Sequence, residues 1–211
     1  MRISYQKKFA YLAIPKTGSS SVRALLDRYS DVRSDESETL FHHQPESQLR
    51  RLISSLGWDV RQFLFFTTVR NPWSRLFSTH TYWVSVAAAT EEDYAHNPRF
   101  HSHCANYVRQ GTDFSQRVRD LASQVPAQAS YLLDPKETMV QPIRLEFLSE
   151  ELEPIWKNLA LDMSDLDDIP FLNRSSQADY REHYDKESIE VVAEAYASDV
   201  SRFGYSFDLG A

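Results

Sequence analysis

The segment that follows the first apolar run carries lysine, glycine and hydroxyl residues in an order suited to holding an anion. Residues 9–14 form a compact apolar run, residues 15–21 read PKTGSSS, and apolar residues then recur at helical spacing. The first turn of a helix offers N–H groups and a partial positive charge, Gly18 lets the backbone approach a ligand closely, and Lys16 adds a point charge. The segment therefore predicts a loop that binds a phosphate-like group.

The order of Lys16 and Gly18 separates this loop from the phosphate loop of ATP and GTP hydrolases. That loop needs a lysine directly after its last glycine, followed by a hydroxyl residue for magnesium. Here Lys16 precedes Gly18, so the order disfavours a nucleotide hydrolase. The plainer alternative is a serine-rich helix start with a solvated lysine, because serine and threonine are common helix caps.

A second polar segment follows the next strand-like run. Residues 63–69 are rich in strand formers and apolar on both faces, and Arg70 stands at their carboxyl end. Ser78 lies about two turns inside the following helix, on the same face as Ser74. If the two strands are parallel neighbours, Arg70 and Ser78 face the same edge as the first loop, where an arginine fork can hold a second phosphate. Together the segments predict a ligand with two separated anionic groups; a structural ion pair is the alternative for Arg70.

The elements that position these residues alternate between strands and helices. Two strand–loop–helix units with buried strands favour an α/β fold with a parallel sheet, which binds ligands at the carboxyl ends of its strands. Residues 138–146 form a third candidate strand, and residues 91–111 are expected to be an irregular insertion. The predicted helices cover residues 19–29, 49–56, 72–84, 114–125, 149–159 and 185–203.

Composition limits the class of protein. The chain has 211 residues, of which 42% are hydrophobic and 13% aromatic, as in a globular protein with a real core. Its net charge of −7 argues against a general attraction to nucleic acid or to an anionic membrane. The single cysteine, Cys104, excludes an intrachain disulfide and favours a reducing compartment. No apolar run approaches the roughly 20 residues that span a bilayer, and we expect no signal peptide and no membrane anchor.

The two polar segments resemble those of sulfotransferases that use 3′-phosphoadenosine 5′-phosphosulfate (PAPS). Residues 15–21 resemble their 5′-phosphosulfate loop, and residues 69–78 resemble their 3′-phosphate motif, with Arg70 and Ser78 eight positions apart. The similarity is closest to the carbohydrate-type family (sulfotransferase family 2), which includes Golgi enzymes and short bacterial relatives. Weaker similarity covers residues 43–50, 126–132, 143–146, 172–175 and 184–207.

This resemblance implies a P-loop-like three-layer fold, with a central parallel sheet flanked by helices. It implies one sulfotransferase domain over residues 1–211, with residues 91–111 as an acceptor-side segment. The implied reaction moves a sulfonate group from PAPS to a hydroxyl of a saccharide or small metabolite by in-line displacement. The product nucleotide is 3′-phosphoadenosine 5′-phosphate (PAP), and no metal is required. The implied location is a bacterial cytoplasm, with a trimmed Golgi-type catalytic domain as the alternative.

The resemblance also assigns roles to individual residues. Lys16 contacts the bridging oxygen and the sulfonate. Arg70 and Ser78 hold the 3′-phosphate, and Arg174 is a further cofactor contact. The residues expected around the 5′-phosphate are Thr17, Gly18, Ser19, Ser20 and Ser21.

The acceptor hydroxyl must lose a proton, and histidine is the natural base near neutral pH. The family-like segment makes His43 the candidate base, with its neighbour His42 as the alternative. His101, His103 and Cys104 invite a metal site, but they lack a fourth ligand and match no strong zinc pattern. We expect these three residues to line the acceptor pocket or to lie on a solvated loop.

Two other functions remain alternatives. One is a P-loop-type nucleotide kinase, which binds ATP in a magnesium-dependent way. The other is a catalytically inactive nucleotide-binding module of the same fold, which lacks a competent base.

Overall fold

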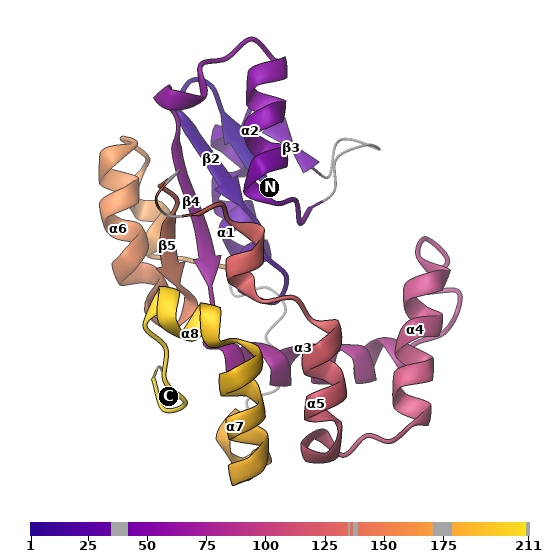
Figure 1. Cartoon of the computed structure of the whole chain (residues 1–211). Coiled ribbons are helices and arrows are strands. Elements are labelled where there is room, and N and C mark those ends of the chain that lie inside the picture. Colours follow the sequence, from indigo (N-terminus) through magenta and orange to yellow (C-terminus); the bar gives the residue numbers. More distant parts are fainter. Residues whose placement is uncertain (35–41, 135, 137–138, 171–178, 210–211) are drawn as a thin grey trace. The chain divides into compact units, whose positions relative to one another are not determined.

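The chain folds into two compact units, described in turn. The computed structural model describes residues 1–34, 42–134, 136, 139–170 and 179–209 (Figure 1). The first unit comprises residues 1–71 and 127–173, and the second comprises residues 72–126 and 174–209. The prediction of a single sulfotransferase domain over residues 1–211 stays a prediction.

The first unit is built on a mixed sheet. Its strands are β1 (Arg2–Ser4), β2 (Phe9–Leu12), β3 (Val32–Arg33), β4 (Leu64–Val69) and β5 (Gln141–Arg144). Over the described residues the sheet has five strands in the order β3-β1-β2-β4-β5 (Figure 1). Strand β4 runs parallel to both β2 and β5, whereas β1 runs antiparallel to both β2 and β3. The α/β fold and its parallel strands are therefore confirmed for β2, β4 and β5, and β1 and β3 add an antiparallel edge that the sequence did not predict.

Helices cover both faces of this sheet, which explains why β2 and nearly all of β4 are buried on both faces. The helices of the first unit are α1 (Ser19–Leu26), α2 (Glu46–Ser55) and α6 (Leu148–Asn158). Tyr11 and Phe66 point to one face, where they share a buried cluster with Trp156 of α6 and apolar residues of α1. The neighbouring residue Phe65 points to the other face, and the guanidinium of Arg50 in α2 lies 3.9 Å from its ring centroid.

The second unit is helical in its described residues. Its helices are α3 (Pro72–Ala88), α4 (Pro98–Arg109), α5 (Phe114–Gln124), α7 (Lys186–Ala195) and α8 (Ala197–Phe203). Helix α3 packs against α4, α5 and α7. The indole Nε1 of Trp73 in α3 donates a hydrogen bond to the carbonyl oxygen of Ile189 in α7 at 3.0 Å. Of the helices in the described part of the chain, none is long and apolar enough to cross a membrane.

Two sequence-based expectations for the second unit are wrong. Residues 98–109 form helix α4 rather than an irregular insertion, because the side chain of Asn97 caps the helix and Pro98 begins it. The predicted helix over residues 185–203 is divided into α7 and α8 at Tyr196, whose backbone leaves the helical region at φ −113° and ψ 29°. The Asp185 cap and the Gly204 end of this segment are both as expected.

Candidate active site

The predicted anion loop lies between the end of β2 and the start of α1. Lys16 and Gly18 both adopt the left-handed backbone conformation, with φ angles of 65° and 72°. Gly18 is the N-cap of α1, and because glycine has no side chain, the cap residue forms no side-chain hydrogen bond to the first turn. The loop therefore presents a helix N-terminus, with its partial positive charge, beside a lysine.

Gly18 suits this position both by its backbone conformation and by its lack of a side chain. A Cβ atom added to Gly18 would lie 2.5 Å from Leu145 Cδ1. Leu145 begins the short 3₁₀ helix η5 (Leu145–Phe147), directly after β5. The loop thus packs against the carboxyl end of β5, and a side chain at position 18 would have to displace the Leu145 side chain.

The hydroxyl of Thr17 is used inside the protein. Thr17 Oγ1 donates to the carbonyl oxygen of Ile14 at 2.9 Å and lies 3.1 Å from Thr68 Oγ1. The Thr68 hydroxyl lies 2.7 Å from the hydroxyl of Tyr11, and all three of these polar side chains are buried. This network ties the loop to β2 and β4. Ser19 and Ser21 are buried as well, whereas Ser20 is half-buried.

The structure brings Lys16 and Arg70 together at one edge of the sheet. Because β2 and β4 are parallel neighbours, the residues after both strands meet at the same edge. Arg70 Nη1 lies 3.5 Å from the carbonyl oxygen of Lys16. Burial, and secondly the charge of Arg70, lower the pKa of Lys16 to about 8. Because the charge of Arg70 disfavours the protonated form of Lys16, negative charge bound at this edge would stabilise both cations.

Two side chains that the sequence analysis did not single out hold the end of β4. Gln128 Oε1 accepts from the backbone N–H of Arg70, and Gln128 Nε2 donates to the Arg70 carbonyl, both at 2.8 Å. Glu146 Oε1 accepts from the backbone N–H of Asn71 at 2.7 Å. The similarity of residues 126–128 and 143–146 to family segments was the only sequence signal for these roles.

His43 lies beside the end of β2. Its Nδ1 is 2.8 Å from the carbonyl oxygen of Ala13. A carbonyl only accepts, so Nδ1 carries the proton and the lone pair is on Nε2. Although part of the ring is exposed, desolvation lowers the pKa of His43 to about 4, so the ring is neutral at neutral pH. A neutral imidazole with its lone pair on Nε2 is able to act as a general base.

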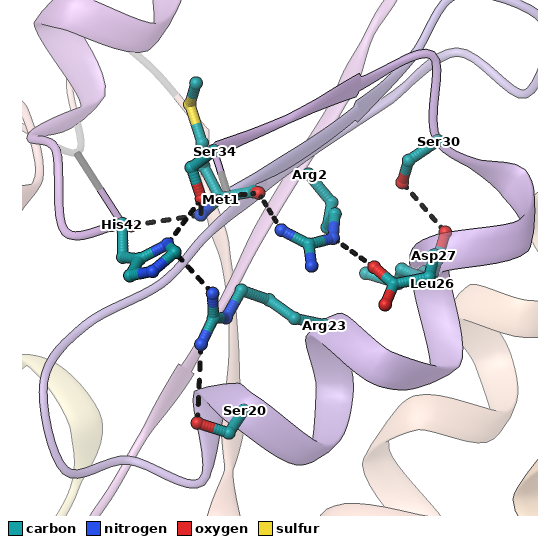
Figure 2. Close-up of polar contacts among 9 residues, drawn as sticks. All are labelled: Met1, Arg2, Ser20, Arg23, Leu26, Asp27, Ser30, Ser34 and His42. Atoms are coloured by element: carbon teal, nitrogen blue, oxygen red, sulfur yellow. Dashed lines mark hydrogen bonds and ion pairs between the residues drawn. The ribbon is translucent and has the colours of Figure 1, made fainter. Parts of the chain in front are cut away.

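His42 has the opposite tautomer. Its Nδ1 lies 2.9 Å from Arg23 Nη1 and 2.8 Å from Ser34 Oγ (Figure 2). A guanidinium only donates, so the lone pair of His42 is on Nδ1 and the neutral ring carries its proton on Nε2. Of the two neighbouring histidines, the contacts therefore favour His43 as the base.

The remaining predicted residues belong to the second unit or lie outside the described residues. Ser78 is buried in α3 and belongs to the second unit. Arg174 lies outside the described residues. The residues that invited a metal site are all on α4, where His101 Nε2 lies 3.1 Å from the Ala89 carbonyl and burial raises the pKa of the Cys104 thiol to about 11. Within the described ranges, no group of three or more His, Cys, Asp and Glu side chains could hold a metal ion.

Comparison with known families decides the class of protein. A family model described as the sulfotransferase family matches residues 1–206, which include both polar segments and most of both units. The chain belongs to the sulfotransferase family. This sulfotransferase is therefore an enzyme that transfers a sulfonate group to a hydroxyl-bearing acceptor, and its family generally uses PAPS as the donor. Searches among curated proteins and among solved structures found no match to this sulfotransferase.

Proposed function

We propose that this sulfotransferase uses PAPS and transfers its sulfonate group to a hydroxyl of a saccharide or small metabolite. The observation that carries the proposal is the meeting of Lys16, Arg70 and the N-terminus of α1 at the shared edge of β2 and β4. The first unit, with helices on both sheet faces, is assigned to the P-loop-like three-layer class. The whole chain is assigned to one sulfotransferase domain.

The residues at this edge fit a nucleotide with two separate phosphate groups. Gly18 has no side chain, which allows the loop backbone to approach a phosphate closely. Lys16 and Arg70 supply two cations at one edge, and repulsion between them favours anion binding. Arg70 would hold the 3′-phosphate, with Ser78 and Arg174 as further contacts suggested by the family resemblance. Because the Thr17 hydroxyl is already bonded within the loop, its contribution to the 5′-phosphate is assigned to its backbone.

Each residue has a separate task in the transfer. PAPS supplies an activated sulfonate, whose sulfur bonds to the acceptor oxygen as its bond to the bridging phosphate oxygen breaks. Lys16 and the helix N-terminus stabilise the negative charge that develops on the leaving phosphate. His43 Nε2 takes the proton from the acceptor hydroxyl, while the Ala13 carbonyl holds the opposite ring nitrogen. Most of the acceleration comes from positioning and electrostatics, as in phosphoryl transfer.

Thermal unfolding with nucleotides tests the proposal. PAP should raise the melting temperature without magnesium, because a ligand that binds only the folded state stabilises it by about 2.7 kcal/mol at a hundred times its Kd. Adenosine, which lacks both phosphates, is the control and should have no effect at the same concentration. A larger, magnesium-dependent effect of ATP would instead support a nucleotide kinase. PAP binding without sulfonate transfer to a broad panel of hydroxyl acceptors would support an inactive nucleotide-binding module.

A further inference from the structure

Arg23 of α1 joins the anion loop to the histidine segment. It lies one helical turn after Ser20, so both side chains are on the same face of α1. Arg23 Nη2 lies 3.4 Å from Ser20 Oγ, and Arg23 Nη1 lies 2.9 Å from His42 Nδ1 (Figure 2). One planar guanidinium therefore contacts a loop residue at one nitrogen and a histidine ring at another.

The histidine segment is held at several points around this contact. The carbonyl oxygen of His42 accepts from the main-chain nitrogen of Met1 at 3.0 Å, and Ser34 Oγ lies 2.8 Å from His42 Nδ1 (Figure 2). His43 follows directly, with its own Nδ1 bonded to the Ala13 carbonyl. A shift of the Arg23 side chain that moves His42 would therefore also move His43, because the two histidines are joined by one peptide bond.

We propose that Arg23 is a positioning residue that links the donor loop to the orientation of the base. This inference rests on the proposed function, because it gives Ser20 to the donor site and His43 to proton removal. The planar fork of arginine reaches two partners in fixed geometry, whereas a lysine ammonium is a single point charge on a flexible stem. Binding of an anion at the loop would move or order Ser20, and Arg23 would transmit this change to the histidine segment.

The charge of Arg23 also affects the environment of His43. Besides desolvation, the positive groups that lower the pKa of His43 are the chain's N-terminus, Arg23 and His42, whereas the bond to the Ala13 carbonyl raises it. Loss of the Arg23 charge should therefore raise the pKa of His43. A purely structural role for Arg23 would change the stability of the fold and the pKa of His43 but would leave the response of both rings to PAP intact.

Nuclear magnetic resonance of the histidine ring nitrogens tests the proposal without an acceptor. The Arg23→Met variant should shift the pKa of His43 upward and lose the response of both rings to added PAP. The Arg23→Lys variant should keep the low pKa of His43, because the charge remains, but should lose the response to PAP, because a single ammonium does not hold Ser20 and His42 in fixed geometry. Arg28→Met is the matched control, since Arg28 is more than half exposed and pairs with Asp162 and Asp165.

The experiment distinguishes a failure of the proposed function from a failure of the role given to Arg23. If the wild-type protein does not bind PAP, the proposed function fails and the coupling fails with it. If the wild-type protein binds PAP but Arg23→Met keeps the response of both rings to PAP, only the role of Arg23 is overturned. Ser20→Ala provides a second route if Arg23→Met does not fold: it should keep the His42 tautomer but abolish the PAP response at His42, and an unchanged response would also overturn the proposal.

Discussion

The side-chain amide of Gln128 bonds to both main-chain polar groups of Arg70, at 2.8 Å in each direction. Gln128 is completely buried and begins the 3₁₀ helix η4 (Gln128–Tyr131). Because β4 ends at Val69, this pair of hydrogen bonds replaces the strand partner that Arg70 would otherwise need. The position of the Arg70 backbone therefore depends on a residue far away in the sequence.

Substitution of Gln128 should weaken binding of the 3′-phosphate more than binding of the 5′-phosphate. In Gln128→Ala, the N–H and C=O groups of Arg70 lose their partners, which should lower the free energy of unfolding by about 1–3 kcal/mol. Binding of PAP should weaken more than binding of adenosine 5′-phosphate, because only PAP has the 3′-phosphate assigned to Arg70. Calorimetric titration with both nucleotides measures the difference. Equal weakening of both would show that Gln128 acts on the fold alone.

The affinity for PAP should depend on pH through Lys16. The pKa of Lys16 is about 8, so the unliganded side chain loses its charge as the pH rises through this value. An anion at the loop favours the charged form, so PAP binding should take up a proton above pH 8 and should weaken as the pH increases. Titration in buffers of different ionisation enthalpy measures the proton uptake.

The Lys16→Met variant should bind PAP weakly and without this dependence on pH. Lys157→Met is the control, because Lys157 is exposed on α6 and pairs with Glu153. A pH dependence that persists in Lys16→Met would assign the proton to another group.

The two neighbouring histidines should differ in their effect on transfer. His43→Ala should reduce the transfer rate by about 10²–10⁴-fold, the usual contribution of a general base, while the affinity for PAP is kept. Since the pKa of His43 is about 4, the wild-type rate should be flat near neutral pH and should fall only as the pH approaches that value and the base is protonated. Transfer of radiolabelled sulfonate to an acceptor panel measures both effects. His42→Ala should lose less activity than His43→Ala, and equal losses would contradict the assignment.

Two glycines offer a matched comparison for the anion loop. Gly18 and Gly57 have similar φ angles, 72° and 77°, but only Gly18 has an atom within 4 Å of an added Cβ. Gly57→Ala should therefore show the cost of the left-handed backbone alone, about 1–2 kcal/mol, whereas Gly18→Ala should add the displacement of Leu145 and weaken PAP binding. Denaturant unfolding of both variants gives the comparison. A second substitution, Leu145→Ala, should recover part of the loss in Gly18→Ala and none in Gly57→Ala.

The central elements of the first unit could be predicted because their signals are local. The apolar runs before Pro15 and Arg70 are long enough to mark strands, and each is followed by a helix start. The sequence did not indicate strands β1 and β3, because they are only three and two residues long and each contains a single apolar residue beside arginine or serine. Nothing in such short segments distinguishes a strand from a loop.

The residues that position other groups of the site are harder to predict from the sequence than the charged residues of the site. Lys16, Arg70 and Gly18 stand out in the sequence because of their types and their places after strands. Gln128 and Arg23 act through contacts with residues 58 and 19 positions away, and no local pattern indicates these partners. Helix α4 was missed for a related reason, since its buried face is formed by His101, Cys104 and Tyr107 rather than by aliphatic residues.

The left-handed backbone of Lys16 sets a limit on engineering this enzyme. A non-glycine residue in that conformation costs about 1–2 kcal/mol, and glycine relieves the cost. Lys16→Gly should therefore yield a more heat-resistant protein that has lost the cation beside the leaving group. Directed evolution guided by thermostability alone would favour this replacement and produce a robust but inert enzyme, so libraries selected for durability should keep position 16 fixed.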